Sequence, residues 1–189
     1  MSTRTLVLSA LFTALLCALA IVPPIPMPLV PVPLTLQTLV VMLAGLIIGP
    51  KAAGLSVLLY VVLAAMGFPV LPGARGGLAV LFGPTGGFLL GMIPGAIVTG
   101  WLAQRVATQK VWVTWSLNAF AALIGGLGVI YLIGVPWLAV VTGMAPLQAL
   151  MAVVVFIPGD FIKAAVAATL AQRVGRLVAP SLNPYTAST

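Results

Sequence analysis

Long apolar runs, separated by short stretches rich in proline, glycine and basic residues, divide the chain into segments of roughly membrane length. The runs cover residues 6–22, 34–48, 52–66, 84–103 and 111–133, and a longer apolar region then extends to residue 171. Between them lie a proline-dense linker (23–33), a glycine-rich stretch (67–83) and a Gly-Val-Pro break (134–136). A helix needs about 20 apolar residues to cross a bilayer, and shorter runs cross where the bilayer thins. The pattern therefore predicts membrane-spanning helices.

The last apolar region allows two interpretations. As one helix it would run from about residue 146 to residue 170, but Pro158 and Gly159 interrupt it. Proline fits the first turn of a helix better than its interior. We therefore expect a short, partly helical segment at 146–156, followed by a spanning helix at 158–176. Either interpretation gives six spans.

The composition supports a membrane protein and excludes several kinds of enzyme. Of the 189 residues, 62% are hydrophobic and 5% are charged, whereas a soluble domain has about 25% charged residues. One acidic residue and no histidine provide no carboxylate pair, no histidine relay and no ligand set for a catalytic metal. We expect a single all-α integral membrane domain, residues 1–189, with six transmembrane helices, no catalytic activity and no cofactor.

The positions of the basic residues predict the orientation of the chain. The eight cations are scattered singly, which argues against a nucleic-acid-binding patch. With six spans, both termini share a side that also holds most of the basic residues: Arg4, Lys51, Arg105, Lys110, Arg173 and Arg176. The opposite loops contain Arg75. Basic residues gather in cytoplasmic loops, so both termini should be cytoplasmic, in the inner (cytoplasmic) membrane of the cell.

The N-terminal run has a competing interpretation as a cleavable signal peptide. Arg4, the apolar stretch and the sequence Ala18-Leu19-Ala20 fit such a peptide. Cleavage would leave five spans and remove the charge asymmetry between the two sides. We therefore favour a retained first helix.

Two rows of small residues indicate where helices approach one another closely. One row lies around the fourth run: Gly83, Gly87, Gly91 and Gly95. The other lies in the first run: Ala10, Ala14 and Ala18. We expect the glycine row to pack inside the subunit. The alanine row fits either internal packing or contact with a helix of another protein.

The sole acid of the chain, Asp160, lies three residues before Lys163, so the two side chains project from neighbouring faces of one helix. An ionisable residue inside a membrane indicates function by default; the alternative is a structural pair that neutralises itself. Pro158 and Gly159 open the helix in its outer half, where free N–H groups could meet a ligand. We expect a site for a small polar molecule, in which Asp160 accepts from N–H groups and Lys163 donates to an oxygen.

Other candidates lie on the same outer side. Thr35 and Gln37 begin the second run and either bind a ligand or form interhelical hydrogen bonds. Arg75 either meets a substrate anion or is solvated. Phe82 and Phe88 either form apolar walls of a pocket or merely pack.

Four further side chains are assigned to packing or to the membrane interface. Asn118 is expected to form a packing hydrogen bond between helices. Trp112, Trp115 and Tyr131 are expected in the aromatic belts at the membrane surfaces. None of the four is expected to form part of the binding site.

Three groups of short motifs follow one another along the chain. They are VPLTLQT at 32–38 with LAG at 43–45 and GPK at 49–51, then GFPV at 67–70 with GG at 76–77 and LFGPTGGF at 81–88, and finally FIPGDFIKA at 156–164. In this order and at this spacing they resemble the second helix, the central signature and the last helix of BioY proteins. These are the biotin-binding S components of energy-coupling-factor (ECF) transporters. The resemblance covers nearly the whole chain.

The resemblance implies six helices and high-affinity capture of biotin from outside in a pocket capped by the outer loops. It also implies partnership with a transmembrane T component and two ABC-type ATPases, which would reorient the loaded subunit in the lipid membrane without changing any bond of biotin. In S components small residues on the first helix meet the T component, and Ala10, Ala14 and Ala18 match that role.

The resemblance also gives the candidate site a chemical partner. The ureido ring of biotin has two N–H donors and a carbonyl, which Asp160 and Lys163 can satisfy between them. Arg75, Thr35 or Gln37 are hypotheses for the carboxylate, and apolar walls suit the thiophane ring.

Two alternatives remain. The first is a self-sufficient secondary carrier for a small vitamin, with Asp160 as its proton site. The chain has no inverted repeat of the kind found in many such carriers. It also has no phosphate-binding loop for hydrolysing nucleotides itself. The second alternative is a scaffold protein without a ligand.

Overall fold

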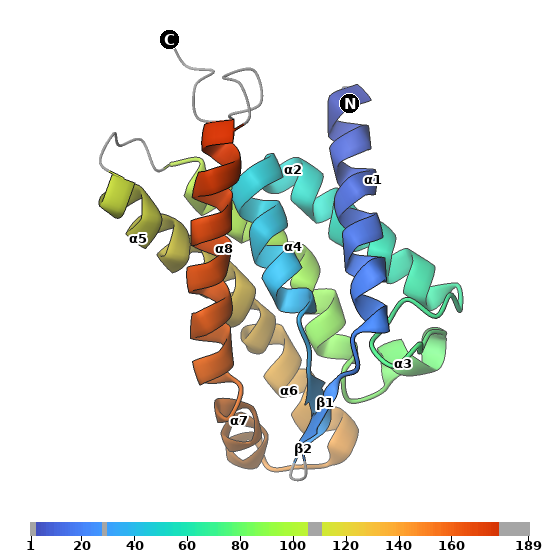
Figure 1. Cartoon of the computed structure of the whole chain (residues 1–189). Coiled ribbons are helices and arrows are strands. Elements are labelled where there is room, and N and C mark those ends of the chain that lie inside the picture. The colour runs from blue at the N-terminus through green and yellow to red at the C-terminus, as the bar shows by residue number, and fades with distance from the viewer. Residues whose placement is uncertain (1–2, 28–29, 106–110, 178–189) are drawn as a thin grey trace.

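Helices form most of the structure, a computed structural model that describes residues 3–27, 30–105 and 111–177. The helical elements are α1 (Thr3–Ala18), the 3₁₀ turn η1 (Leu19–Ile21), α2 (Gln37–Ala65), α3 (Leu78–Phe82), α4 (Gly86–Ala103), α5 (Val111–Leu123), the π-helical segment η2 (Ile124–Val129), α6 (Ile130–Thr142), α7 (Pro146–Val154) and α8 (Ile157–Leu177). Strands β1 (Ile25–Met27) and β2 (Val30–Leu34) pair antiparallel between α1 and α2. The helix α2 lies against α1, α4 and α8, and α4 also lies against α6 (Figure 1).

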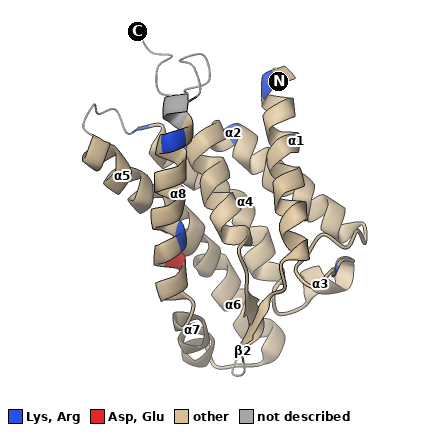
Figure 2. Ribbon diagram, viewed as in Figure 1, with Lys and Arg blue, Asp and Glu red and all other residues tan. Residues whose placement is uncertain are grey.

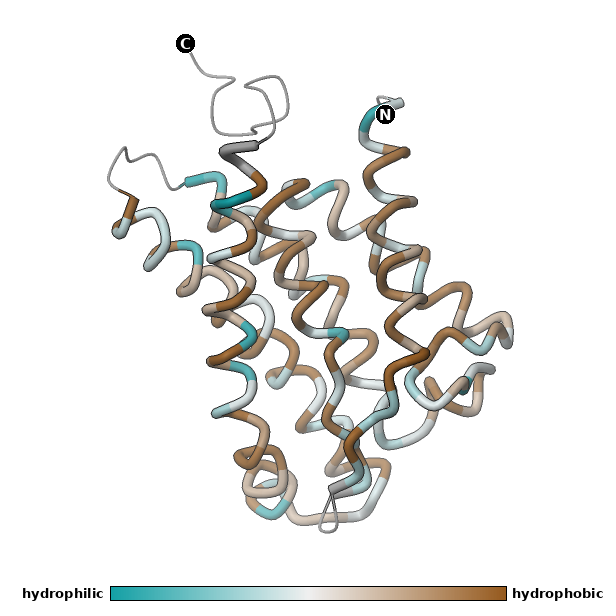
Figure 3. The backbone as a smooth tube through the Cα atoms, in the orientation of Figure 1, coloured by the Kyte–Doolittle hydropathy of each residue, from teal (hydrophilic) through white to brown (hydrophobic). Residues whose placement is uncertain are grey.

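The lengths and apolar composition of the helices are those of a membrane protein. Four helical stretches of the described chain are long and apolar enough to cross a bilayer: residues 3–21, 37–65, 86–103 and 111–142. The pair α7 and α8 makes a fifth if the two helices, bent by 53°, count as one span. Figure 3 shows that the long helices are hydrophobic over most of their length. The prediction of an all-helical membrane protein is confirmed apart from the small β-hairpin, which no sequence pattern indicated.

The helix α2 bends sharply at Gly49 and Pro50. Gly49 has φ 77° and ψ 173°, a conformation that glycine adopts without steric cost, and Pro50 cannot continue the hydrogen-bonding pattern. The helix α4 packs closely on the bend, because a Cβ at Gly100 would lie 2.6 Å from the Pro50 nitrogen. The chain runs along one arm to the bend and returns along the other, so both arms extend from the bend toward the end of the molecule that holds α3 and the β-hairpin (Figure 1). The two helices expected from the runs 34–48 and 52–66 are therefore present as the two arms of α2, separated by the non-helical Gly49.

The predicted break at residues 134–136 is wrong. The helix that begins at α5 continues through η2 into α6, with Pro136 inside α6, and ends at Gly143, whose φ is 71°. Membrane helices tolerate proline because neighbouring groups satisfy the backbone atoms that it leaves free. By contrast, the predicted short segment before the last helix is confirmed, since α7 ends at Val154 and Pro158 lies in the first turn of α8.

The glycine row of α4 packs inside the subunit, as expected. Cβ atoms added at Gly87, Gly91 and Gly95 would lie 2.3, 3.1 and 2.7 Å from atoms of α6 or η2. Gly83 differs, because it ends α3 and precedes α4. The close approach of α4 to the α5–η2–α6 helix therefore depends on three of the four glycines.

Gly125→Ala is expected to destabilise the fold. Its Cβ would lie 2.1 Å from Thr99 Oγ1 and 2.4 Å from the carbonyl oxygen of Gly95, and overpacking of this kind costs about 1–3 kcal/mol. The unfolding temperature of the detergent-purified protein should fall by several degrees. Gly128→Ala in the same π-helical segment is the matched control, since its Cβ would meet the Leu123 carbonyl oxygen at 3.8 Å. Equal unfolding temperatures of the two variants would contradict this prediction.

The helix α1 divides into a packed face and a free face. Ser9 Oγ donates to the carbonyl oxygen of Ala52 at 3.0 Å, and Thr13 Oγ1 donates to that of Ser56 at 2.9 Å. These bonds join α1 to α2. The alanine row is exposed on the other side of the helix: Ala10, Ala14 and Ala18. Packing among the described residues therefore does not cover the row.

Basic residues gather at one end of the molecule, as Figure 2 shows. The start of α1, the bend of α2, the end of α4 and the end of α8 meet there (Figure 1). These segments carry four of the six expected cations: Arg4, Lys51, Arg105 and Arg173. Lys110 and the side chain of Arg176 lie outside the described residues. The charge asymmetry agrees with the expected arrangement, and the cytoplasmic location of that end stays a prediction.

Candidate binding site

A cavity lies at the other end of the molecule, between the β-hairpin, the loop before α3 and the first turns of α2, α4, α6 and α8. The empty space measures about 680 Å³, a figure that includes space open to solvent. Apolar side chains such as Leu89, Met92 and Ile130 form one part of its wall. Polar side chains converge on another part, where α2, α6 and α8 meet. Such a cavity suits a ligand with a polar head and an apolar body.

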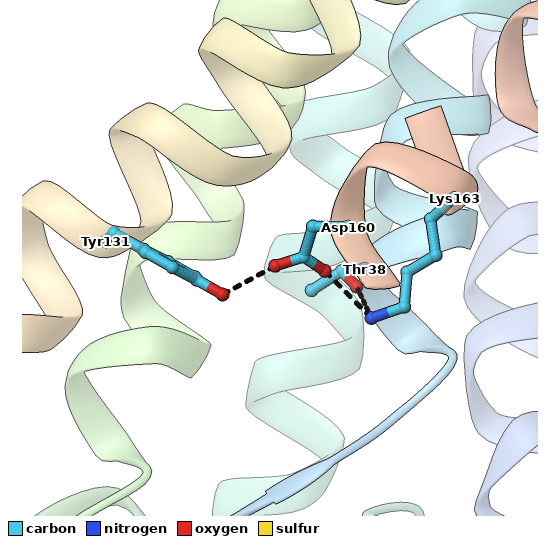
Figure 4. A network of polar contacts seen from close by, with 4 residues as sticks. All are labelled: Thr38, Tyr131, Asp160 and Lys163. Atoms are coloured by element: carbon cyan, nitrogen blue, oxygen red, sulfur yellow. Dashed lines mark hydrogen bonds and ion pairs between the residues drawn. The ribbon is translucent and has the colours of Figure 1, made fainter. Parts of the chain in front are cut away.

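The centre of the polar part is a buried ion pair. Lys163 Nζ lies 2.9 Å from Asp160 Oδ1, and the two residues are 8% and 2% exposed. The same nitrogen donates to Thr38 Oγ1 at 2.9 Å, and the Tyr131 hydroxyl donates to Asp160 Oδ2 at 2.5 Å (Figure 4). Three helices thus hold one carboxylate and one ammonium group at the cavity wall. A buried ion pair is stable only with such additional hydrogen bonds.

The local sequence explains why the pair faces the cavity. Pro158 and Gly159 occupy the first turn of α8, and the Asp160 N–H donates to the Phe156 carbonyl at 3.0 Å. Asp160 therefore lies in the first helical turn, where the helix dipole favours a negative charge. The three-residue spacing then places Lys163 on the same face.

Three of the other predicted polar residues line the same cavity. Thr35 lies at the junction between β2 and α2. Gln37 is buried and donates from Nε2 to the Tyr60 hydroxyl. Arg75 is exposed and donates from Nε to the carbonyl oxygen of Pro72 at 3.1 Å. The Gln37 side chain thus joins the two arms of α2, and the exposed Arg75 guanidinium lies at the solvent side of the cavity.

The two predicted phenylalanines differ. Phe88 lines the cavity, and its ring meets the Tyr131 ring edge-on, with centroids 6.0 Å apart and an interplanar angle of 86°. Phe82 is 70% exposed and is not among the residues that line the cavity. Phe82 is the last residue of the short helix α3, and no residue of that helix is buried. The structure therefore does not bring Phe82 to the candidate site.

Sequence reasoning missed two residues of the polar part. Thr38 directly follows Gln37, so its position after the proline-dense linker was a usable signal. Tyr131 was expected in a membrane-interface belt, and that expectation is wrong because its hydroxyl bonds Asp160 inside the cavity. Asn118 also departs from expectation, since its buried Oδ1 has no hydrogen-bond partner in the described structure.

Comparison with known proteins identifies the family. The model of the BioY family matches residues 1–180. The chain belongs to the BioY family. The resemblance noted in its sequence motifs is thereby confirmed, and the family consists of transporters rather than enzymes.

Individual BioY relatives match over nearly the whole chain. The biotin transporter BioY of Rhizobium etli is 47% identical over 176 residues, which cover 92% of this chain and 94% of that protein. The probable biotin transporter BioY of Bacillus subtilis is 41% identical over 94% of this chain and 93% of its own. A crystal structure of the S-component for biotin from an ECF-type ABC transporter superposes with a TM-score of 0.86 at 32% identity, covering 93% of this chain and 95% of that one.

Proposed function

We propose that this chain captures biotin and carries it across the cytoplasmic membrane as the substrate-binding S component of an ECF-type ATP-driven transporter. The names of its BioY relatives and of the solved S-component support the substrate. The observation that carries the proposal is the buried pair of Asp160 and Lys163 in the wall of a largely apolar cavity. It provides an acceptor and a donor on one part of the cavity wall.

The chemistry of biotin complements this cavity. Its ureido ring has two N–H groups, one of which donates to the Asp160 carboxylate, and one carbonyl oxygen, to which Lys163 donates. The thiophane ring and the methylene chain then lie against apolar residues such as Leu89 and Met92. The carboxylate of biotin points toward the solvent side, where Arg75 supplies the cation and the Thr35 hydroxyl donates a hydrogen bond. The second amide N–H of the buried Gln37 is a further candidate donor. Burial of the apolar parts contributes about 25 cal/mol per Å².

The proposed topology has six spans, with the two arms of α2 counted separately. Both termini and the basic end of the molecule face the cytoplasm, in accordance with the positive-inside rule. The cavity then faces outward, where the β-hairpin and the loop at 67–77 cover its mouth. Biotin would enter from outside, past Arg75, and reach Asp160 last.

Energy for transport would come from other proteins. The sequence contains no phosphate-binding loop of the Walker type, so we assign ATP hydrolysis to two ABC-type ATPases. A transmembrane T component would couple these ATPases to this chain. The exposed alanine row of α1, Ala10, Ala14 and Ala18, is the proposed contact with that component. Small residues let two helices approach closely within a membrane.

Titration of the purified chain with biotin tests the proposed substrate. We expect saturable binding at one site in isothermal titration calorimetry, and no binding of thiamine, which lacks a ureido group. Absence of biotin binding would contradict the proposal and favour a scaffold protein. The secondary-carrier alternative is tested in proteoliposomes: uptake of biotin driven by a pH gradient, without ATP and without partners, would support that alternative instead.

A further inference from the structure

We infer that Tyr131 is a positioning residue that makes the site selective for a neutral ureido group over a cationic analogue. The inference rests on the proposed function, because it concerns the same carboxylate. It starts from the hydroxyl of Tyr131, which donates to Asp160 Oδ2 at 2.5 Å (Figure 4). The residue lies on α6, whereas Asp160 and Lys163 lie on α8.

Each carboxylate oxygen of Asp160 accepts a hydrogen bond from a different residue. Lys163 Nζ lies 2.9 Å from Oδ1, and the Tyr131 hydroxyl donates to Oδ2. The torsion that rotates a carboxylate about its bond to Cβ has broad minima, so one contact alone would leave its plane poorly defined. Two donors fix the plane and therefore the directions in which the remaining lone pairs point.

Packing holds the Tyr131 ring in place. Its ring meets Phe88 edge-on, and Phe88 in turn packs against α6 at Gly134, where a Cβ would lie 2.3 Å from Phe88 Cδ1. The neighbouring Ile130 is 1% exposed. The hydroxyl can therefore keep its position when a ligand arrives.

The hydrogen-bond count explains the selectivity. A carboxylate accepts about four hydrogen bonds, and Tyr131 and Lys163 take one at each oxygen of Asp160. The remaining positions suit the N–H groups of a neutral ureido ring. For a cationic ligand, the attraction of the Asp160 carboxylate is reduced because Tyr131 and Lys163 already donate to it. The ammonium group of Lys163 also repels such a ligand. When the Tyr131 hydroxyl is removed, Asp160 Oδ2 loses its donor. The carboxylate then attracts a cationic ligand more strongly.

The test compares biotin with 2-iminobiotin, whose guanidinium group replaces the ureido group. Tyr131→Phe is expected to weaken the binding of biotin about tenfold or more, the usual loss for a hydrogen bond to a charged group. The affinity for protonated 2-iminobiotin should fall about threefold or less, because its extra donors compensate for the lost hydroxyl. The measured quantity is the ratio of the two dissociation constants, by calorimetry at one pH.

Thr169→Val is the matched control. It removes the acceptor of the Trp115 indole N–H, a 3.0 Å hydrogen bond that also joins the α5–η2–α6 helix to α8, but Thr169 does not line the cavity. The control should leave the ratio unchanged. Equal losses for both ligands in Tyr131→Phe, or no loss for either, would overturn the inference while the proposed function stands. A wild-type chain that does not bind biotin would overturn both.

Discussion

Asp160→Asn is expected to reduce the affinity for biotin by at least about a hundredfold, because the amide offers one acceptor oxygen where the carboxylate offers two and carries no charge. The loss should be larger than the effect of any substitution in the cavity outside the ion pair. Lys163→Ala should have a similar effect, since it removes the donor proposed for the ureido carbonyl. Calorimetric titration of each purified variant with biotin provides the measurement.

Folding must be separated from binding in this experiment. Removing one member of a buried ion pair leaves the other charge uncompensated and costs about 3–5 kcal/mol, so each single variant is expected to unfold at a lower temperature. The double variant Asp160→Asn/Lys163→Gln contains no buried charge and should recover most of the lost thermal stability without recovering biotin binding. Biotin affinity of the double variant near that of the wild type would show that the pair is structural.

An exposed cation at the opposite end serves as the charge control. Lys51→Gln removes one positive charge at the bend of α2, where the side chain is exposed and does not line the cavity. Its affinity for biotin should equal that of the wild type. A loss there would mean that net charge, and not the geometry at Asp160, governs binding.

The elements that the sequence predicted correctly are those in which a single local cause dominates. Apolar runs of membrane length became helices because backbone groups in a bilayer must bond within the segment. Pro158 marked the start of α8 because its ring suits a first turn. Asp160 and Lys163 stood out as the sole acid and its nearest cation, so their burial together followed from the cost of an isolated charge in a membrane.

The features that the sequence did not predict depend on distant partners. The helix continues through Pro136 because tertiary contacts outweigh the local preference of proline. The β-hairpin has prolines in both strands, which usually indicate a linker rather than a strand. Tyr131 lies two residues after the π-helical segment η2, and the wider turn of that segment changes the direction in which the side chains of α6 point. A regular helical period therefore could not place its hydroxyl at Asp160.

Ala14→Leu is expected to leave biotin binding unchanged but to weaken assembly with a T component. Ala14 is exposed on the face of α1 that turns away from α2, so a larger side chain there disturbs no contact among the described residues. At an interface where two helices approach over small residues, the added volume forces them apart. Overpacking costs about 1–3 kcal/mol, which weakens such an assembly by about fivefold to a hundredfold. Co-purification from a membrane that contains a T component and its ATPases measures the effect.

The control is the next outward-facing residue of the same helix. Leu15→Phe also enlarges an exposed side chain, 42% exposed in the wild type, but one that is rotated by about 100° from Ala14 around the helix. Its complex should co-purify as the wild type does. Loss of the complex in both variants would point to a general sensitivity of α1, and assembly of Ala14→Leu at the wild-type level would remove the alanine row from the interface. Since biotin binding is measured on the same preparations, each outcome separates the contact with the partner from the capture of the vitamin.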